Sequence, residues 1–157
     1  MQVKVKKLNE RAVLPKKAHP TDAGFDLVAT SKTIDKNGNI VYGTGLAFEI
    51  PEGYVGYIFP RSSISKQDIA LSNSVGVIDC HYRGEVMFKF KPTMYCLSNN
   101  SAEDKLFPIV PIVIKGYKVG DRIGQLIIMP IPEIELEEAD ELSETDRGTG
   151  GYGSSGR

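Results

Sequence analysis

The sequence predicts an all-β domain, either a sandwich or a barrel, on three observations. Short apolar or alternating segments recur along the 157 residues, which is the pattern of strands buried on one or both faces. Glycine, proline, asparagine and aspartate gather between these segments, where turns are expected. Helical periodicity is scarce. Many short strands separated by turns favour a closed or two-layered β fold.

Four strands are expected before residue 60. The first alternates valine with lysine, which is the period of a half-buried strand. The last two are joined at Pro51-Glu52-Gly53, a turn with proline early and glycine late. Thr33 to Gly38 is expected to be a polar turn. The four strands are Gln2 to Leu8, Leu27-Val28, Ile40 to Ile50 and Tyr54 to Phe59.

A short helix and a hairpin are expected next. The hydroxyls that follow Arg61 fit a short helix, Ser63 to Asp68, with an ordinary N-cap, and Ile69 to Leu71 leads into the hairpin. The hairpin is expected to turn at Cys80-His81, and Gly84 precedes its second strand. Its first, buried strand contains Val75, Val77 and Ile78, and its second contains Val86, Phe88 and Phe90.

After the hairpin the pattern loosens. Lys91 to Phe107 indicates a solvent-exposed excursion, and Ile109 to Ile114, interrupted by a proline, is at best an edge strand. Gly116 to Asp121 is expected to be a turn. Arg122 to Gln125 then leads into a strong strand, Leu126 to Ile131.

The C-terminal region suggests a division into residues 1–132, the β domain, and residues 133–157, a tether and an arm. Glu133 to Asp146 carries eight acidic residues, which is typical of a solvated connector. The last eleven residues include five glycines, so chain entropy disfavours a packed structure there.

The glycine-rich arm has two interpretations. Its exposed amides, together with Arg147, Ser154 and Ser155, would suit a polyphosphate, and Tyr152 would stack on a base. It lacks the Gly-Lys-Ser/Thr ending of a Walker loop. The alternative is a plain low-complexity tail.

Composition and the cysteine spacing argue against several classes of function. The net charge of −1 gives no basic excess for duplex nucleic acid, so no direct nucleic-acid partner is expected. No segment approaches the roughly 20 apolar residues of a membrane span, and no signal peptide is recognisable. Cys80 and Cys96 fit neither a disulfide framework nor a zinc spacing. A cytoplasmic, reducing setting is therefore expected.

Three strand ends carry candidate chemistry. Asp79 ends the first hairpin strand and Tyr82 follows on the turn, so that an acid beside an aromatic ring fits a heterocycle and its sugar; an aspartate that caps its own turn is the alternative. Arg61 with its two following serines would bind phosphate oxygens. Asp26, two residues after Gly24, is either a turn cap or part of a metal site.

Five stretches, in order, resemble the five motifs of the trimeric dUTP pyrophosphatase (dUTPase) family. The third and fifth are long and specific, whereas Arg-x-x-Gln alone would identify nothing. The resemblance extends from about residue 20 to the end of the chain. The five stretches are Ala23 to Leu27, Pro60 to Ser63, Asn73 to Gly84, Arg122 to Gln125 and Arg147 to Gly156.

The resemblance implies a jelly-roll-like β-barrel that assembles as a homotrimer with three active sites at subunit interfaces. The C-terminal arm of one subunit would be exchanged and would close over a neighbouring active site. The acidic connector would then be the tether that delivers the arm.

The implied reaction is hydrolysis of dUTP to dUMP and pyrophosphate with Mg²⁺. Asp79 would deprotonate a water for in-line attack on the α-phosphorus, and Arg61 would pair with and position Asp79. Mg²⁺ would be chelated mainly by the triphosphate, with Asp26 holding a metal-bound water in an outer-sphere role.

The resemblance also assigns substrate contacts. Asn73 and the nearby backbone of Val77 and Ile78 would pair with the uracil edge, and Tyr82 would pack beneath the deoxyribose, excluding a 2′-hydroxyl. The remaining contacts, to the phosphates and from the closing arm, are assigned to Ser62, Ser63, Gln125, Arg147, Gly151, Tyr152, Gly153, Ser154 and Ser155.

Some positions depart from the family pattern. Gly124 replaces the usual alanine and Tyr152 the commoner phenylalanine, and both changes preserve the implied function. Cys80 and His81 have no assigned catalytic role. The excursion is longer than in compact members, and residues 91–116 are the candidate surface for a protein partner. The rival functions are the related dCTP deaminase, which shares the barrel, and a binding or regulatory protein.

Overall fold

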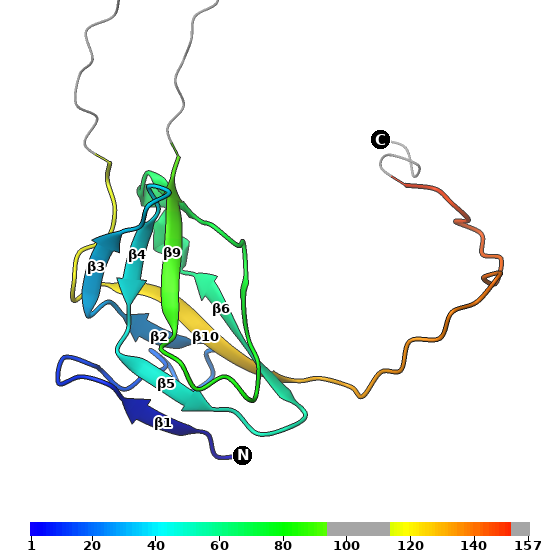
Figure 1. Cartoon of the computed structure of the whole chain (residues 1–157), viewed down its shortest axis with the longest axis horizontal. Helices are drawn as coiled ribbons and strands as arrows, with labels where there is room; N and C mark the ends of the chain where they lie inside the picture. Colours follow the sequence, from blue (N-terminus) through cyan, green and yellow to red (C-terminus); the bar gives the residue numbers. More distant parts are fainter. Residues whose placement is uncertain (94–113, 152–157) are drawn as a thin grey trace, which may run out of the picture.

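The computed structural model describes residues 1–93 and 114–151, which form an all-β fold. Figure 1 shows its strands and the C-terminal segment that leaves the last of them. A single short 3₁₀ helix, η1 (Ser62–Lys66), interrupts the strands in this described part. The strands are β1 (Lys4–Lys7), β2 (Phe25–Val28), β3 (Ser31–Ile34), β4 (Ile40–Gly43), β5 (Leu46–Glu49), β6 (Tyr54–Pro60), β7 (Ile69–Leu71), β8 (Gly76–Ile78), β9 (Met87–Pro92) and β10 (Arg122–Pro130).

The strands form two four-stranded antiparallel sheets and a two-stranded ribbon. One sheet has the order β2-β10-β6-β8, the other has the order β3-β4-β9-β7, and β1 pairs with β5. Apart from β3 and β4, the paired neighbours in each four-stranded sheet are not consecutive in sequence, as expected for a jelly roll. The predicted jelly-roll-like β fold is therefore confirmed.

The core lies between the two sheets and follows the alternation of the strands. On β9, Phe88 and Phe90 are fully buried and stacked with ring centroids 6.1 Å apart, whereas Met87 and Lys89 point outward. This is the period of two that the sequence predicted. Tyr42 donates a 2.8 Å hydrogen bond to the carbonyl of Tyr117, and burial raises the pKa of its phenol.

Two strand predictions in the first half are corrected. The expected strand Ile40 to Ile50 is divided into β4 and β5, because Gly45, with φ at +66°, turns the chain from one sheet to the ribbon. The expected turn Thr33 to Gly38 begins later, since β3 includes Thr33 and Ile34. All four residues of β3 are exposed, so no apolar pattern marked it.

The expected hairpin around Cys80-His81 is wrong as a strand pair. β8 pairs with β6, whereas β9 pairs with β4 and β7 in the other sheet. The loop therefore crosses between sheets. The first strand is also less buried than expected, because Val77 is an exposed residue of an edge strand.

Two further expectations are changed or only partly covered. The predicted helix Ser63 to Asp68 is the 3₁₀ turn η1, whose N-cap is Arg61 and has no side-chain capping bond. The expected edge strand Ile109 to Ile114 and most of the excursion lie outside the described residues; Ile114 itself is not in a strand.

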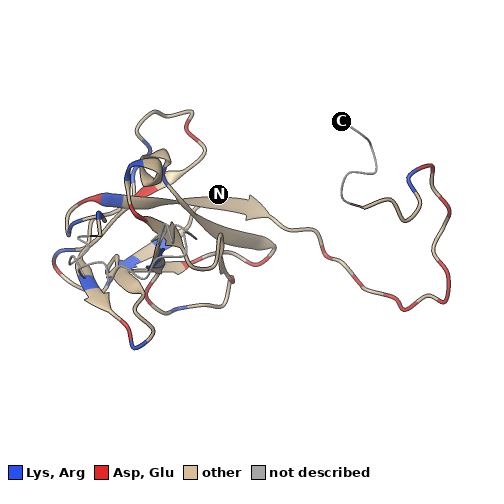
Figure 2. Ribbon diagram, turned by 90° about the horizontal axis from the view of Figure 1, so that it is seen from above, with Lys and Arg blue, Asp and Glu red and all other residues tan. Residues whose placement is uncertain are grey.

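The acidic segment leaves β10 without forming a strand, and its residues from 131 to 149 are exposed. Figures 1 and 2 show it projecting from the domain, and the ribbon of Figure 2 marks acidic residues in red along it. This agrees with a solvated connector. Among the described residues, no helix is long and apolar enough to cross a membrane.

Candidate active site

A polar pocket of about 300 Å³ lies where three adjacent strands bring four of the predicted residues together. β10 lies between β2 and β6, and its Gln125 is opposite Asp26 on one side and Phe59 on the other. Arg61 and Ser62 follow the end of β6. The pocket is lined by Ala18, Asp22, Ala23, Gly24, Asp26, Arg61, Ser62 and Gln125.

Asp26 is held between two guanidinium groups. Nε of Arg61 donates a 2.7 Å hydrogen bond to Oδ1, and Nη1 of Arg122 donates a 2.9 Å hydrogen bond to Oδ2. The Asp26 side chain is 16% exposed and that of Arg122 is 52% exposed. Arg61 keeps guanidinium N–H donors that Asp26 does not use, and these suit an anion such as phosphate. Asp22 adds a second carboxylate to the lining, whereas Arg122 lies outside it.

Gly24 permits the close approach of Gln125. A β-carbon at Gly24 would lie 2.5 Å from Oε1 of Gln125, closer than real contacts allow. The Gln125 amide makes a long 3.5 Å contact to the carbonyl of Pro60, so its side chain reaches from β10 toward the end of β6. A side chain at position 24 would therefore displace the Gln125 side chain from this place.

The two predicted serines of η1, Ser62 and Ser63, differ in availability. Ser62 is exposed and lines the pocket. Ser63 lies 3.1 Å from the hydroxyl of buried Tyr117, with either oxygen as donor. Sequence reasoning missed Tyr117 and the role of Arg122, because both depend on contacts between segments that are distant along the chain.

A second group of predicted residues lies on and after β8. Within the described chain β8 pairs with β6 alone, so its other edge presents unpaired backbone N–H and C=O groups. Asn73 and Asp79, at either end, are exposed. The hydroxyl of Tyr82 donates a 3.1 Å hydrogen bond to the carbonyl of Glu85. This edge, with an adjacent acid and ring, can pair with a planar polar ligand.

The two groups are separated in one chain. Ile78 is opposite Gly56, so Asp79 lies near the start of β6 and Arg61 just beyond its end, roughly 20 Å apart at the rise of a strand. Arg61 makes its ion pair with Asp26. The expected Arg61–Asp79 pair is therefore absent among the described contacts of a single chain. A single chain therefore does not bring these two groups of predicted residues together.

The arm is described only in part. Arg147 is exposed and its Nε donates a 3.0 Å hydrogen bond to the carbonyl of Gly150, closing a local turn. A β-carbon at Gly151 would meet open space. The predicted contacts Tyr152, Gly153, Ser154 and Ser155 lie outside the described residues.

The pocket fits a metal bound by the ligand better than a metal bound by the protein. Across residues 1–93 and 114–151, no group of three or more His, Cys, Asp or Glu side chains could hold a metal ion. Each oxygen of Asp26 accepts one guanidinium bond and keeps a second acceptor position. That position is available for a further hydrogen bond, and the outer-sphere metal role of Asp26 stays a prediction.

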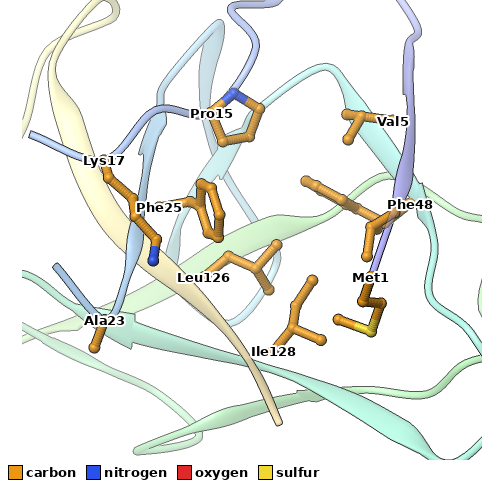
Figure 3. Close-up of a pocket in the computed structure, with 10 residues that line it drawn as sticks. Met1, Val5, Pro15, Lys17, Ala23, Phe25, Phe48, Leu126 and Ile128 are labelled. Carbon is orange, nitrogen blue, oxygen red and sulfur yellow. The ribbon is translucent and has the colours of Figure 1, made fainter. Parts of the chain in front are cut away.

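A separate apolar pocket of about 290 Å³ lies between the β1-β5 ribbon and β10 (Figure 3). In Figure 3, Val5, Phe48 and Met1 face Leu126 and Ile128 across it. Lys17 contributes the pocket's ionisable side chain, and its ammonium lies 5.0 Å from the centre of the Phe25 ring. Its lining offers few groups for chemistry and suits an apolar protein segment.

Known proteins of one family resemble this chain in sequence and in structure. The family model described as dUTPase matches residues 10–96 and 111–156. The deoxyuridine 5′-triphosphate nucleotidohydrolase of Nautilia profundicola is 41% identical, with all of both chains covered. That of Corynebacterium glutamicum is 39% identical and covers 99% of this chain and 95% of its own.

Solved structures give the same result. The dUTPase of Staphylococcus bacteriophage 80alpha, with dUpNHpp, has a TM-score of 0.78 and 31% identity over 99% of both chains. A dUTPase mutant from S. aureus phage phi11, described with a structural Mg(II) ion, has a TM-score of 0.69 and 26% identity over 92% of this chain and 100% of its own. The chain belongs to the dUTPase family.

Proposed function

We propose that this chain is a dUTP diphosphatase that hydrolyses dUTP to dUMP and pyrophosphate in the cytoplasm, limiting uracil incorporation into DNA and supplying dUMP for dTMP synthesis. The observation that carries the proposal is the Asp26 carboxylate fixed between Arg61 and Arg122 beside Gln125. Preorganised cations of this kind stabilise the charge of a phosphate chain in phosphoryl transfer.

One group of the predicted residues contacts the base and the sugar of dUTP, and the other contacts its phosphates. Asp79 accepts the proton of the attacking water. The free edge of β8 at Val77 and Ile78, with Asn73, pairs with the uracil edge, and Tyr82 packs against the deoxyribose. A rigid edge gives steric discrimination against the thymine methyl and the 2′-hydroxyl.

The phosphate chain is bound by Arg61, Ser62, Ser63 and Gln125. When bound with the substrate, Mg²⁺ neutralises charge on the triphosphate and keeps several waters. Asp26 accepts a hydrogen bond from one of these waters at the acceptor position that its arginines leave unused. The structural Mg(II) ion described for the phi11 relative supports the choice of Mg²⁺ as the metal.

A homotrimer with exchanged arms would join the two separated groups. Roughly 20 Å between Asp79 and Arg61 along β6 is too far for one substrate to contact both within one chain. A site built from β8 of one subunit and the Asp26 pocket of another would allow one substrate to contact both groups. The arm, with Arg147, Gly151 to Gly153, Ser154 and Ser155, then closes over the nucleotide and contacts the γ-phosphate.

The tether carries a pattern that suits exchange. Ile134 and Leu136 alternate with glutamates and are 70% and 92% exposed, which is a strand pattern without a partner in the described chain. β1 alternates valines with Lys4 and Lys6, and pairs with β5 alone among the described strands. The glutamates complement these lysines, and the two apolar side chains suit the pocket of Figure 3. We assign residues 133–137 of a neighbouring subunit to this edge.

The deciding experiment measures pyrophosphate release from dUTP with Mg²⁺, beside dCTP, dTTP and UTP at equal concentration. Turnover of dUTP alone supports the reaction together with the base and sugar selectivity. Ammonia release from dCTP identifies the deaminase alternative instead. Inactivity on all four substrates by a folded trimer would indicate a binding protein.

A protein partner at residues 91–116 is a second, compatible proposal. The described ends of this segment, Thr93 and Lys115, both hydrogen-bond to Asp68, which follows η1. Replacing residues 94–113 with a short linker between these anchored ends should spare hydrolysis and abolish partner binding. Loss of hydrolysis in that variant would show that the segment serves the enzyme itself.

A further inference from the structure

A β-bulge in β10 determines where Arg122 points. Side chains of a regular strand alternate between faces, so Arg122 would share the core-facing side of Gly124 and Leu126. The pairing of β10 with β2 instead shifts register: Arg122 is opposite Val28 and Gly124 is opposite Leu27. Two residues on β10 thus span one on β2, which is the signature of a bulge.

The bulge turns two consecutive residues toward the core. Ile123 is fully buried, and Gly124 is buried beside it. Arg122 is consequently placed on the outer face with Gln125, where its guanidinium reaches Asp26 at 2.9 Å. Without this shift, the guanidinium would be directed into an apolar core at a high desolvation cost.

The ring of Phe88 occupies the space that a side chain at position 124 would need. A β-carbon on Gly124 would collide with Cε1 and Cζ of this ring and would lie 2.8 Å from the carbonyl oxygen of Phe59. Phe88 itself is fixed from the other sheet, fully buried and stacked on Phe90 with an interplanar angle of 11°. A rigid ring therefore packs directly against the bulge.

We propose that Phe88 is a positioning residue for the active site: by filling the place of a side chain at Gly124, its ring holds the bulge that turns Arg122 toward Asp26. The role of Gly124 is then specific to this pair of residues. This inference rests on the proposed hydrolysis of dUTP, because turnover reports the position of Arg122.

The first test is a pair of compensating substitutions. Gly124→Ala adds a methyl where the ring lies, and Phe88→Leu removes the ring from that place. Each single variant should lower kcat by about 10- to 100-fold, as small displacements of catalytic groups do. The double variant should recover at least about tenfold over Gly124→Ala, although the Phe59 carbonyl contact keeps it below the wild type. Equal activity of Gly124→Ala and wild type, or no recovery in the double variant, would overturn the proposal.

A second test separates positioning from general destabilisation. In an Arg122→Gln background, Gly124→Ala should cause no further loss of kcat, because the group that the bulge positions is already absent. Losses that multiply would show that position 124 acts through something else. Gly45→Ala is the control, since its φ of +66° and its contact with Asn9 make alanine destabilising at a place outside the pocket. It should lower Tm and leave kcat unchanged.

The two proposals fail in different ways. A wild-type chain without dUTP turnover contradicts the proposed function. The packing of Phe88 against Gly124 can then still be tested by measuring the unfolding free energies of the wild type, the two single variants and the double variant. Phe88→Leu should offset part of the loss of stability that Gly124→Ala causes. Additive costs would show that the ring and the glycine are independent.

Discussion

The guanidinium of Arg61 reaches Asp26 across an intervening strand. Arg61 follows the end of β6 and Asp26 belongs to β2, and β10 separates these two strands. Nε of Arg61 and Oδ1 of Asp26 are nevertheless 2.7 Å apart. The bond passes beside Gln125, which is paired with Asp26 in register. One ion pair thus fixes the positions of groups from three strands around the phosphate pocket.

We expect Asp26→Asn to impair catalysis and stability together. The amide leaves Arg61 and Arg122 without a shared counter-charge, which should cost about 1–3 kcal/mol of unfolding free energy. It also weakens the acceptor for a metal-bound water, so the Mg²⁺ concentration for half-maximal turnover should rise. Asp121→Asn is the control, because that carboxylate caps its own turn at Lys118. Unchanged Mg²⁺ dependence in Asp26→Asn would contradict the outer-sphere role.

Asp79→Asn should separate binding from turnover. Asparagine keeps the size of the side chain but cannot accept the proton of the attacking water, so kcat should fall about 10²- to 10⁴-fold. Affinity for dUTP, measured by calorimetry, should remain close to that of the wild type. Glu52→Gln, which alters an exposed acid near His81, serves as the control. Near-full activity of Asp79→Asn would remove this residue as the base.

The sequence predicted the local parts of this fold and site better than the long-range ones. The alternation of Phe88 and Phe90 marks a strand by itself, and the five motifs identify the family. The partner of Arg61 could not be predicted, because it lies two strands away and depends on sheet order. The outward position of Arg122 depends on a bulge that period-two reasoning does not contain. Polar β3 gave no apolar signal at all.

Asp35 should make stability depend on pH at the acid end. Hydrogen bonds from the Asn39 side chain above all, then from backbone amides, with Lys89 beside it, hold the pKa of this carboxyl well below its usual range. A carboxyl with a lower pKa in the folded state stabilises the fold above its unfolded pKa of about 3.9, and this is lost as pH falls further. Asp35→Ala should therefore lower Tm at neutral pH, with a difference that shrinks below about pH 4.

Thermal unfolding at several pH values measures this effect, and Lys36→Ala, at an exposed neighbour, is the control. A Tm difference for Asp35→Ala that stays constant down to pH 2 would show that the ionised carboxylate contributes nothing.

Charge exchange between tether and β1 should test the assembly. Glu133→Lys with Glu135→Lys places lysines against Lys4 and Lys6 of a neighbouring subunit, and like charges in register are destabilising. The dissociation constant of the trimer should be larger than that of the wild type, as measured by analytical ultracentrifugation. Adding Lys4→Glu and Lys6→Glu to the same chain, with Glu49→Lys so that the ion pair of residues 4 and 49 is kept in reversed form, should restore the trimer. Glu141→Lys with Glu144→Lys, beyond the alternating segment, should leave assembly unchanged.

If the combined tether and β1 substitutions do not restore the trimer while all variants are folded, the tether does not bind along β1 of a neighbouring subunit. Restoration that is weaker in high salt would support ion pairs at this edge, because exposed pairs are screened.

Removal of residues 147–157 should leave a folded trimer with weak turnover. The segment that we assign to β1 ends before Arg147, so assembly does not depend on the deleted arm. The deletion removes Arg147 and the amides that contact the γ-phosphate, and an arginine supplied in trans contributes about 10³- to 10⁵-fold in related phosphoryl transfers. A loss of kcat/KM of about a hundredfold or more is therefore expected. Arg147→Ala in the full chain should reproduce most of this loss, whereas Arg157→Ala should not. Unchanged kinetics of the truncated chain would exclude the arm from the mechanism and leave the two strand-borne groups as the whole of the site.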